Sequence, residues 1–176
     1  MKMVKRYHPG LVTLHWLIAL LIFTVAFLGI YLDDFASTAQ KPGLLGIHMA
    51  VGLLTLVLMV VRIFVRVNTP KPAPVTAGNA VFDWIGKATH LGLYVFVILT
   101  TGTGMLTSMQ GNLMPVVYGG VGTLPADFFT ITAFIGHVIS LPVLVLTIFL
   151  HIGAALYHQF LLKDNLLARM GYGSQQ

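Results

Sequence analysis

The sequence predicts an all-α membrane protein, a bundle of four transmembrane helices, from its composition, its apolar runs and the placement of its charges. Hydrophobic residues make up 57% of the 176 residues and charged residues only 9%, with a mean hydropathy of +0.88. Soluble domains carry about 25% charged residues, so this chain is expected to lie in a lipid bilayer. Because no water satisfies backbone groups there, the spanning segments must be helices.

Four apolar runs are long enough to cross the hydrocarbon core, which takes about 20 residues of helix. They cover residues 11–31, 44–65, 85–107 and 128–158. Their connections are short, so residues 1–176 are expected to form a single transmembrane domain. The fourth run is the longest, and Pro142 within it removes one backbone hydrogen bond and could kink the helix.

The positive charges predict the orientation of the bundle. The first and third connections hold one cation, Lys41, against Asp33, Asp34 and Asp127. The other cations precede the first span, flank the second connection or follow the fourth span: Lys2, Lys5, Arg6, Arg62, Arg66, Lys71, Lys87, Lys163 and Arg169. Positive loops stay in the cytoplasm, so both termini are expected on the cytoplasmic side of a bacterial inner membrane. This bias explains the net charge of +5, and no nucleic-acid partner is expected.

Four histidines lie inside the spans at two depths. His15 and His151 are near the cytoplasmic ends of the first and fourth spans, and His48 and His137 are near the outer ends of the second and fourth. His137 and His151 are fourteen residues apart, which is about 21 Å of helix and about 40° short of four full turns. Both imidazoles therefore leave one face of a single helix, near opposite sides of the bilayer.

This arrangement is typical of two stacked haems, each held by two histidines. A lone histidine in a span often only forms a hydrogen bond between helices, but four at paired depths favour ligation. The chain has no cysteine, so the haems are expected to be non-covalent b-type haems with iron ligands His15, His48, His137 and His151. His90, near the start of the third span, could replace His15 at the inner iron, and spacing does not decide between them.

Other residues of the spans have two readings each. His158 lies seven residues beyond His151 and either faces lipid headgroups or donates a proton to a quinone beside the inner haem. Glycines such as Gly29 and Gly104 either let a porphyrin approach the backbone or serve ordinary helix packing. The outer segment 108–125 is glycine-rich yet apolar, and is expected to fold back onto the bundle.

The chain resembles the bacterial cytochrome b561 family, which is related to the cytochrome b subunits of hydrogenases and formate dehydrogenases. The resemblance covers nearly the whole chain. The residues that carry it are Leu14-His15-Trp16-Leu17, His48, His90-Leu91-Gly92-Leu93-Tyr94, the stretch from Thr101-Gly102 to Gly111, Pro115-Val116, His137 and His151. The family pattern implies the pairs His15–His151 and His48–His137, and implies that His90 is not a ligand.

The stand-alone members of this family imply an oxidoreductase of the superoxide:ubiquinone type. Such an enzyme oxidises periplasmic superoxide to dioxygen and passes the electrons through two bis-histidine haems to ubiquinone. In this chain His158 is the candidate for protonating the quinone. Lys41 is the candidate for attracting the anionic superoxide, as the one cation of the outer connections.

Two other functions are compatible with parts of this pattern. The chain could be a haem-bearing membrane anchor that relays electrons for a dehydrogenase or hydrogenase. It could also be a haem-free channel or transporter, although the chain has no Glu and the four runs contain no Asp to form a carboxylate relay. A homo-oligomer is compatible with the sequence as well.

Overall fold

The computed structural model describes residues 6–171, and within that range it is helical without any β-strand. Four helices are long and apolar enough to cross a membrane: α1 (Pro9–Asp34), α2 (Lys41–Asn68), α3 (Ala80–Gln110) and α5 (Thr132–Leu156), the last continued by the π-helix η2 (Tyr157–Leu161). The predicted all-α fold with four spans is therefore confirmed. Lys2 and Lys5, which contribute to the predicted orientation, lie outside the described residues.

The first three spans extend past the predicted apolar runs because polar residues and prolines start the helices. His8 caps α1, its Nδ1 accepting from the Gly10 N–H at 3.1 Å, and Pro9 occupies a first-turn position where no backbone donor is needed. Asn79 caps α3 in the same way, with its side chain accepting from the Val81 N–H at 2.8 Å. With these caps, α1 and α3 begin before the apolar runs that hydropathy identifies.

The fourth span begins later than predicted. Residues Phe128–Thr130 form a 3-10 turn, η1, because the Asp127 carboxylate accepts from the Phe129 N–H at 2.8 Å and closes a tight turn there. Helix α5 begins only at Thr132 and stays α-helical through Pro142. At its other end the backbone widens into the π-helix η2, so a helical phase calculated for a uniform α-helix no longer holds at His158.

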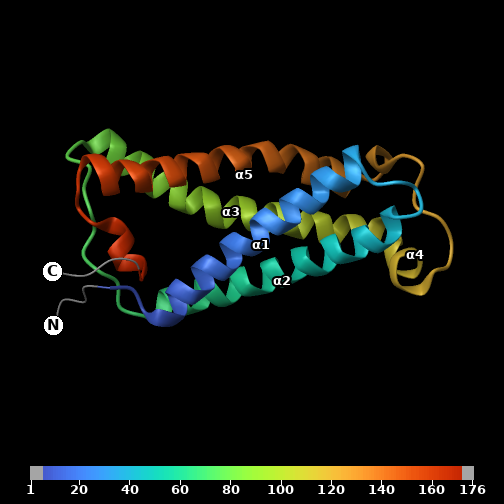
Figure 1. Cartoon of the computed structure of the whole chain (residues 1–176), viewed down its shortest axis with the longest axis horizontal. Helices are drawn as coiled ribbons and strands as arrows, with labels where there is room; N and C mark the ends of the chain where they lie inside the picture. Colours follow the sequence, from blue (N-terminus) through green and yellow to red (C-terminus); the bar gives the residue numbers. More distant parts are fainter. Residues whose placement is uncertain (1–5, 172–176) are drawn as a thin grey trace.

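The four spans pack as neighbours in chain order, with α1 along α2, α2 against α3 and α3 along α5 (Figure 1). The backbone of α5 stays apart from those of α1 and α2 along most of its length. A central apolar cluster takes one buried residue from each span: Ile18, Met59, Val97 and Leu144. Leu144 is seven residues from both His137 and His151, so this cluster separates the two histidine depths along α5.

The two ends of the bundle differ in what closes them (Figure 1). The connection 68–80 and the first and last described residues lie at one end, called here the linker end. The 3-10 helix η3 (Leu166–Met170) lies at this end as well (Figure 1). The Trp16 indole N–H donates to the Met170 carbonyl at 3.3 Å, and Arg169 donates to the Ala73 carbonyl at 2.7 Å. The C-terminal segment thus joins α1 to the connection 68–80.

The opposite end, called here the α4 end, is covered by the short helix α4 (Leu113–Gly119) (Figure 1). Leu113 is only 2% exposed, and the Tyr118 hydroxyl donates to the Gly46 carbonyl at 2.8 Å. A Cβ at Gly46 would lie 2.8 Å from Val117, so glycine there lets α4 approach α2. The expectation that segment 108–125 folds back onto the bundle is confirmed. The sequence did not predict that part of this segment forms the helix α4.

Candidate functional site

Two pairs of histidines bridge the helices, one at each end of the bundle. The ring centroids of His15 on α1 and His151 on α5 are 6.0 Å apart. Those of His48 on α2 and His137 on α5 are 6.2 Å apart. The residues that share a depth in the sequence are thus neighbours in space, and the spacing on α5 sends one histidine to each pair. That these pairs bind iron stays a prediction.

The separations fit a metal held between two imidazoles. A metal bound to two imidazole nitrogens at about 2.0 Å each separates the ring centres by roughly 6.3 Å, since each nitrogen lies about 1.15 Å from its ring centre. Both pairs are within 0.3 Å of that value. His90 lies closer to His151, with its centroid at 5.3 Å, which is too short for a metal between opposite faces. The residues present therefore fit two axially ligated haems.

Glycines of neighbouring helices make room for both histidines at the α4 end. A Cβ at Gly29 would lie 3.3 Å from Cε1 of His48, and one at Gly104 would lie 3.1 Å from Nδ1 of His137. Both distances are tighter than ordinary van der Waals contact. By contrast, a Cβ at Gly102 would meet nothing within 4 Å. The sequence suggested two roles for these glycines, close approach of a porphyrin to the backbone or packing between helices. The structure adds a third, because each glycine leaves room for an imidazole ring of a neighbouring helix.

The protonation of His137 is set by a backbone carbonyl. Its Nδ1 lies 2.7 Å from the carbonyl oxygen of Thr100 on α3. A carbonyl only accepts, so Nδ1 carries the proton and Nε2 keeps the lone pair that a metal needs. The Nδ1 of His48 is buried without a hydrogen-bonding partner in the described chain, although the Val25 backbone approaches this imidazole. Both rings thus turn their Nδ1 edge towards a neighbouring helix.

Cationic and aromatic side chains surround the pair at the linker end. The Trp16 ring lies 5.1 Å from His15, and Arg62 is the charged neighbour shared by His15 and His151. The Arg62 guanidinium donates to the Leu11 carbonyl at 2.6 Å and so joins α2 to α1. Arg66 lies over the Tyr94 ring at 5.9 Å. This end places fixed positive charge beside the histidine pair.

His158 forms a pair with a carboxylate that the sequence did not single out. Its Nδ1 lies 2.5 Å from Oδ2 of Asp164, and the two side chains are only 15% and 23% exposed. The other carboxylate oxygen, Oδ1, is buried without a partner in the described chain. No periodic pattern links these residues, because the π-helix and a turn separate them.

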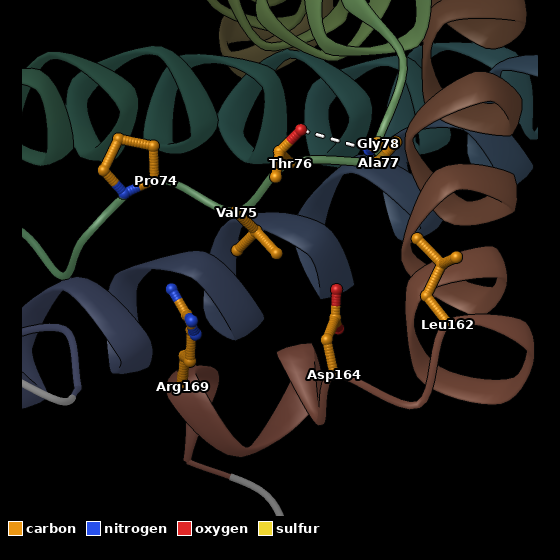
Figure 2. Close-up of a pocket in the computed structure, with 8 residues that line it drawn as sticks. All are labelled: Pro74, Val75, Thr76, Ala77, Gly78, Leu162, Asp164 and Arg169. Atoms are coloured by element: carbon orange, nitrogen blue, oxygen red, sulfur yellow. Dashed lines mark hydrogen bonds between the residues drawn. The ribbon is translucent and has the colours of Figure 1, made fainter.

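A hollow of about 490 Å³ opens beside this pair (Figure 2). It lies between linker residues 74–78 and the C-terminal segment, and Leu162, Asp164 and Arg169 complete its wall. Asp164 and Arg169 project towards the linker across the hollow (Figure 2). The linker end therefore offers a carboxylate and a guanidinium around one opening, and the carboxylate is also the partner of His158.

Lys41 is the first residue of α2, at the α4 end. It precedes His48 by seven residues, which is about 10 Å of helix and about 20° short of two turns, so both residues share a face of α2. Its ammonium group forms no ion pair with Asp33 or Asp34, both of which the structure describes. The cation is thus free to act at the end that holds His48.

A four-helix membrane bundle with histidine pairs between its helices defines the class of b-type membrane cytochromes. The family described as prokaryotic cytochrome b561 matches residues 6–173 of this chain. A Yersinia pestis protein named probable superoxide oxidase CybB is 32% identical over 96% of this chain and 97% of its own length. Escherichia coli cytochrome b561 homolog 2 is 28% identical over 94% and 91%, and Cereibacter sphaeroides cytochrome b562 is 29% identical over 90% of both chains.

The chain belongs to the prokaryotic cytochrome b561 family. The resemblance drawn from the histidine spacing is confirmed. Membership makes this a multi-pass membrane protein that carries b-type haem in electron transport, and it sets aside a haem-free channel or transporter.

Proposed function

We propose that the protein is a di-haem superoxide oxidase that passes electrons from superoxide to ubiquinone. The observation that carries this proposal is the pair of imidazole separations, 6.0 and 6.2 Å, at the two ends of one bundle. Bound there, two haems would supply one-electron transfer between the two faces of the membrane. The name of the Yersinia pestis relative supports the choice of superoxide as the electron donor.

The ring separations support two ligand pairs. His48 and His137 would hold the haem at the α4 end, and His15 and His151 the haem at the linker end. The separation of 5.3 Å between the His90 and His151 rings favours His15 over His90 as the partner of His151. If two histidines hold each haem in this way, no iron position would be left for dioxygen, and the haems would supply outer-sphere electron transfer.

The charge distribution supports one orientation of the bundle in the membrane. The described cations Arg6, Lys71, Lys87, Lys163 and Arg169 belong to segments at the linker end, whereas Lys41 is the one cation of the connections at the α4 end. The linker end, with the first and last described residues, is therefore cytoplasmic, and the α4 end faces the periplasm across the inner membrane. Superoxide is then oxidised at the α4 end, where the free ammonium group of Lys41 attracts the anion.

The linker end supplies the proton chemistry. Two superoxide anions give two electrons and leave as two dioxygen molecules, while one ubiquinone takes those electrons with two protons and leaves as ubiquinol. His158 is the proton donor, and Asp164 holds its Nδ1 so that Nε2 faces away from the carboxylate. The hollow beside Asp164 would let protons from the cytoplasmic surface reach the His158–Asp164 pair (Figure 2).

The test is stopped-flow mixing of superoxide with the oxidised purified protein, with and without ubiquinone, under anaerobic conditions. We expect low-spin b-type bands, two haems per chain, rapid haem reduction by superoxide and reoxidation that requires ubiquinone. A protein that holds two haems but reacts with superoxide no faster than free haem controls would reject superoxide as donor. Reduction of ubiquinone only with an added dehydrogenase would establish the membrane-anchor function instead.

A further inference from the structure

Thr100 departs from the other hydrogen-bonded threonines of the spans. Six of them donate their hydroxyl to the carbonyl four residues earlier in their own helix, which is the ordinary arrangement in an apolar helix. These are Thr24, Thr55, Thr101, Thr103, Thr107 and Thr147. The Thr100 hydroxyl instead leaves α3 and donates to the Ser140 hydroxyl on α5 at 2.9 Å. The Thr100 hydroxyl therefore joins two helices, whereas the other six hydroxyls bond only within their own helix.

The bond is part of a closed network around His137. Ser140 in turn donates to the His137 carbonyl at 3.0 Å, and Nδ1–H of His137 donates to the Thr100 carbonyl at 2.7 Å. Thr100 is 5% exposed and Ser140 is 3% exposed, so the network is shielded from solvent and lipid. Each polar group in it has a partner, which is the condition for a buried network to hold a unique geometry. Both the backbone and the side chain of Thr100 therefore hold the segment that carries His137.

Gly104 is needed for the same contact. The Thr100 carbonyl points towards residue 104 along the helix, as every carbonyl does four residues before its partner. A Cβ at 104 would lie 3.1 Å from Nδ1 and 3.2 Å from Cε1 of His137. Glycine thus leaves the approach to the carbonyl open, and an alanine would push the imidazole away from it.

The pair at the linker end has no counterpart of this network. No hydrogen bond among the described residues involves the imidazole of His15 or His151, whose neighbours are instead aromatic rings and Arg62. A backbone acceptor on Nδ1 fixes the ring and makes the other nitrogen a stronger donor. A stronger donor favours the oxidised metal, so such a bond lowers the reduction potential of the iron it serves.

We propose that Thr100, Ser140 and Gly104 are positioning residues for His137, and that they lower the potential of the haem at the α4 end relative to an unsupported ligand. This inference rests on the proposed function in one respect, the assignment of His137 as an iron ligand. Thr100 and Ser140 act through His137 and not on the haem itself.

The experiment is a redox titration of the purified di-haem protein, read in the visible spectrum and by the low-spin electron paramagnetic resonance signals of the two haems. Gly104→Ala is compared with Gly102→Ala, a matched change in the same helix where the added Cβ meets nothing within 4 Å. We expect Gly104→Ala to shift one midpoint potential upwards and to change one low-spin signal. The second haem, and both haems of Gly102→Ala, should keep their wild-type values.

Thr100→Val and Thr100→Ser test the side-chain part of the network. Valine keeps the shape but removes the hydroxyl, so the same potential should rise, whereas serine should restore it. Loss of only the α4-end haem in Gly104→Ala, with roughly a 10-fold or greater fall in haem affinity, would also support the inference. If Gly104→Ala does not fold, the threonine pair decides alone.

The inference and the proposed function fail in different ways. A wild-type protein without a haem at His137 would reject the ligand assignment and with it the proposed function. A wild-type protein with two haems, whose potentials and signals are unchanged by both Gly104→Ala and Thr100→Val, would overturn only the positioning role. A shift confined to the linker-end haem would overturn it as well.

Discussion

The α4 end and the linker end contain the same chemical unit, two facing imidazoles, in different surroundings. At the α4 end the rings lie against glycines, and His137 donates to a carbonyl within a shielded network of hydroxyl groups. At the linker end the rings lie beside Trp16, His90 and Arg62, with His158 and Asp164 further along the chain. One end fixes the geometry of an imidazole, and the other gathers a guanidinium and a pair of titratable side chains. Under the proposed function, superoxide gives up an electron and no proton at the α4 end. Ubiquinone takes up both electrons and protons at the linker end, where the titratable groups lie.

The largest expected effect comes from removing one ligand at each end. His137→Ala should lose the haem at the α4 end and His151→Ala the haem at the linker end, because each removes one of two axial nitrogens. The haem-to-protein ratio should fall from two to about one in both variants, as measured by the pyridine haemochrome spectrum. His90→Ala is the control and should keep both haems. Loss of a haem in His90→Ala, with none lost in His15→Ala, would reverse the ligand assignment at the linker end.

The second comparison concerns proton delivery, which should depend on the linker end only. His158→Ala should slow reoxidation of the reduced haems by ubiquinone roughly 100-fold, the lower range for loss of a general acid. Haem reduction by superoxide should be unchanged, since it takes place at the α4 end. Asp164→Asn should have a smaller effect of the same kind, because the amide can still hold the ring.

Stopped-flow absorbance separates the two steps in a single experiment. His8→Ala serves as the control, since His8 is an exposed histidine at the same end that caps α1. An equal slowing of reoxidation in His8→Ala and His158→Ala would remove His158 from the mechanism.

A smaller effect is expected from charge at the α4 end. Lys41→Glu should lower the second-order rate of haem reduction by superoxide several-fold at low ionic strength, because it replaces the attracting charge with a repelling one. The difference should shrink as salt is added, since the screening length is about 10 Å at 0.1 M. Lys71→Glu, at the linker end, should leave this rate unchanged. Equal rates for wild type and Lys41→Glu at low salt would exclude Lys41.

The smallest effect should come from the C-terminal segment. Trp16→Phe removes the hydrogen bond from the indole N–H to the Met170 carbonyl, which contributes about 1 kcal/mol at most for a partly exposed group. Thermal release of haem, followed in the Soret band, should begin slightly earlier for the linker-end haem only. Trp84→Phe, at an exposed position, provides the matched control. Earlier release of the α4-end haem instead would contradict the separation of the two ends.

The parts of this protein that sequence could predict are those that repeat with the period of a helix in lipid. The four membrane spans follow from hydropathy. His137 and His151 share a face of α5 because fourteen residues nearly complete four helical turns. Membership in the cytochrome b561 family follows from the same spacing together with His15 and His48. Depth alone could not separate His15 from His90, because both lie near the start of a span. Their ring distances to His151 depend on the rotation of α1 and α3, which no sequence period reveals.

The remaining features depend on contacts between residues far apart or on irregular backbone. Helix α4 lies in a glycine-rich segment without a hydrophobic period, and its position is set by Tyr118 and Gly46. The pairing of His158 with Asp164 depends on the π-helix η2, which no pattern in the local sequence predicts. Thr100 resembles Thr101 and Thr103 in sequence, and only its contact with Ser140, forty residues away, distinguishes it.

Helix α5 contributes one imidazole to each pair, and it leaves the ribosome after α1, α2 and α3. A nascent chain that has inserted only α1, α2 and α3 thus contains only one histidine of each pair. Under the proposed function, haem binding at both pairs must wait until α5 has been inserted. Each porphyrin would then link α5 to α1 or α2, whose backbones make few contacts with that of α5. Haem binding would in that case also complete the packing of the four spans.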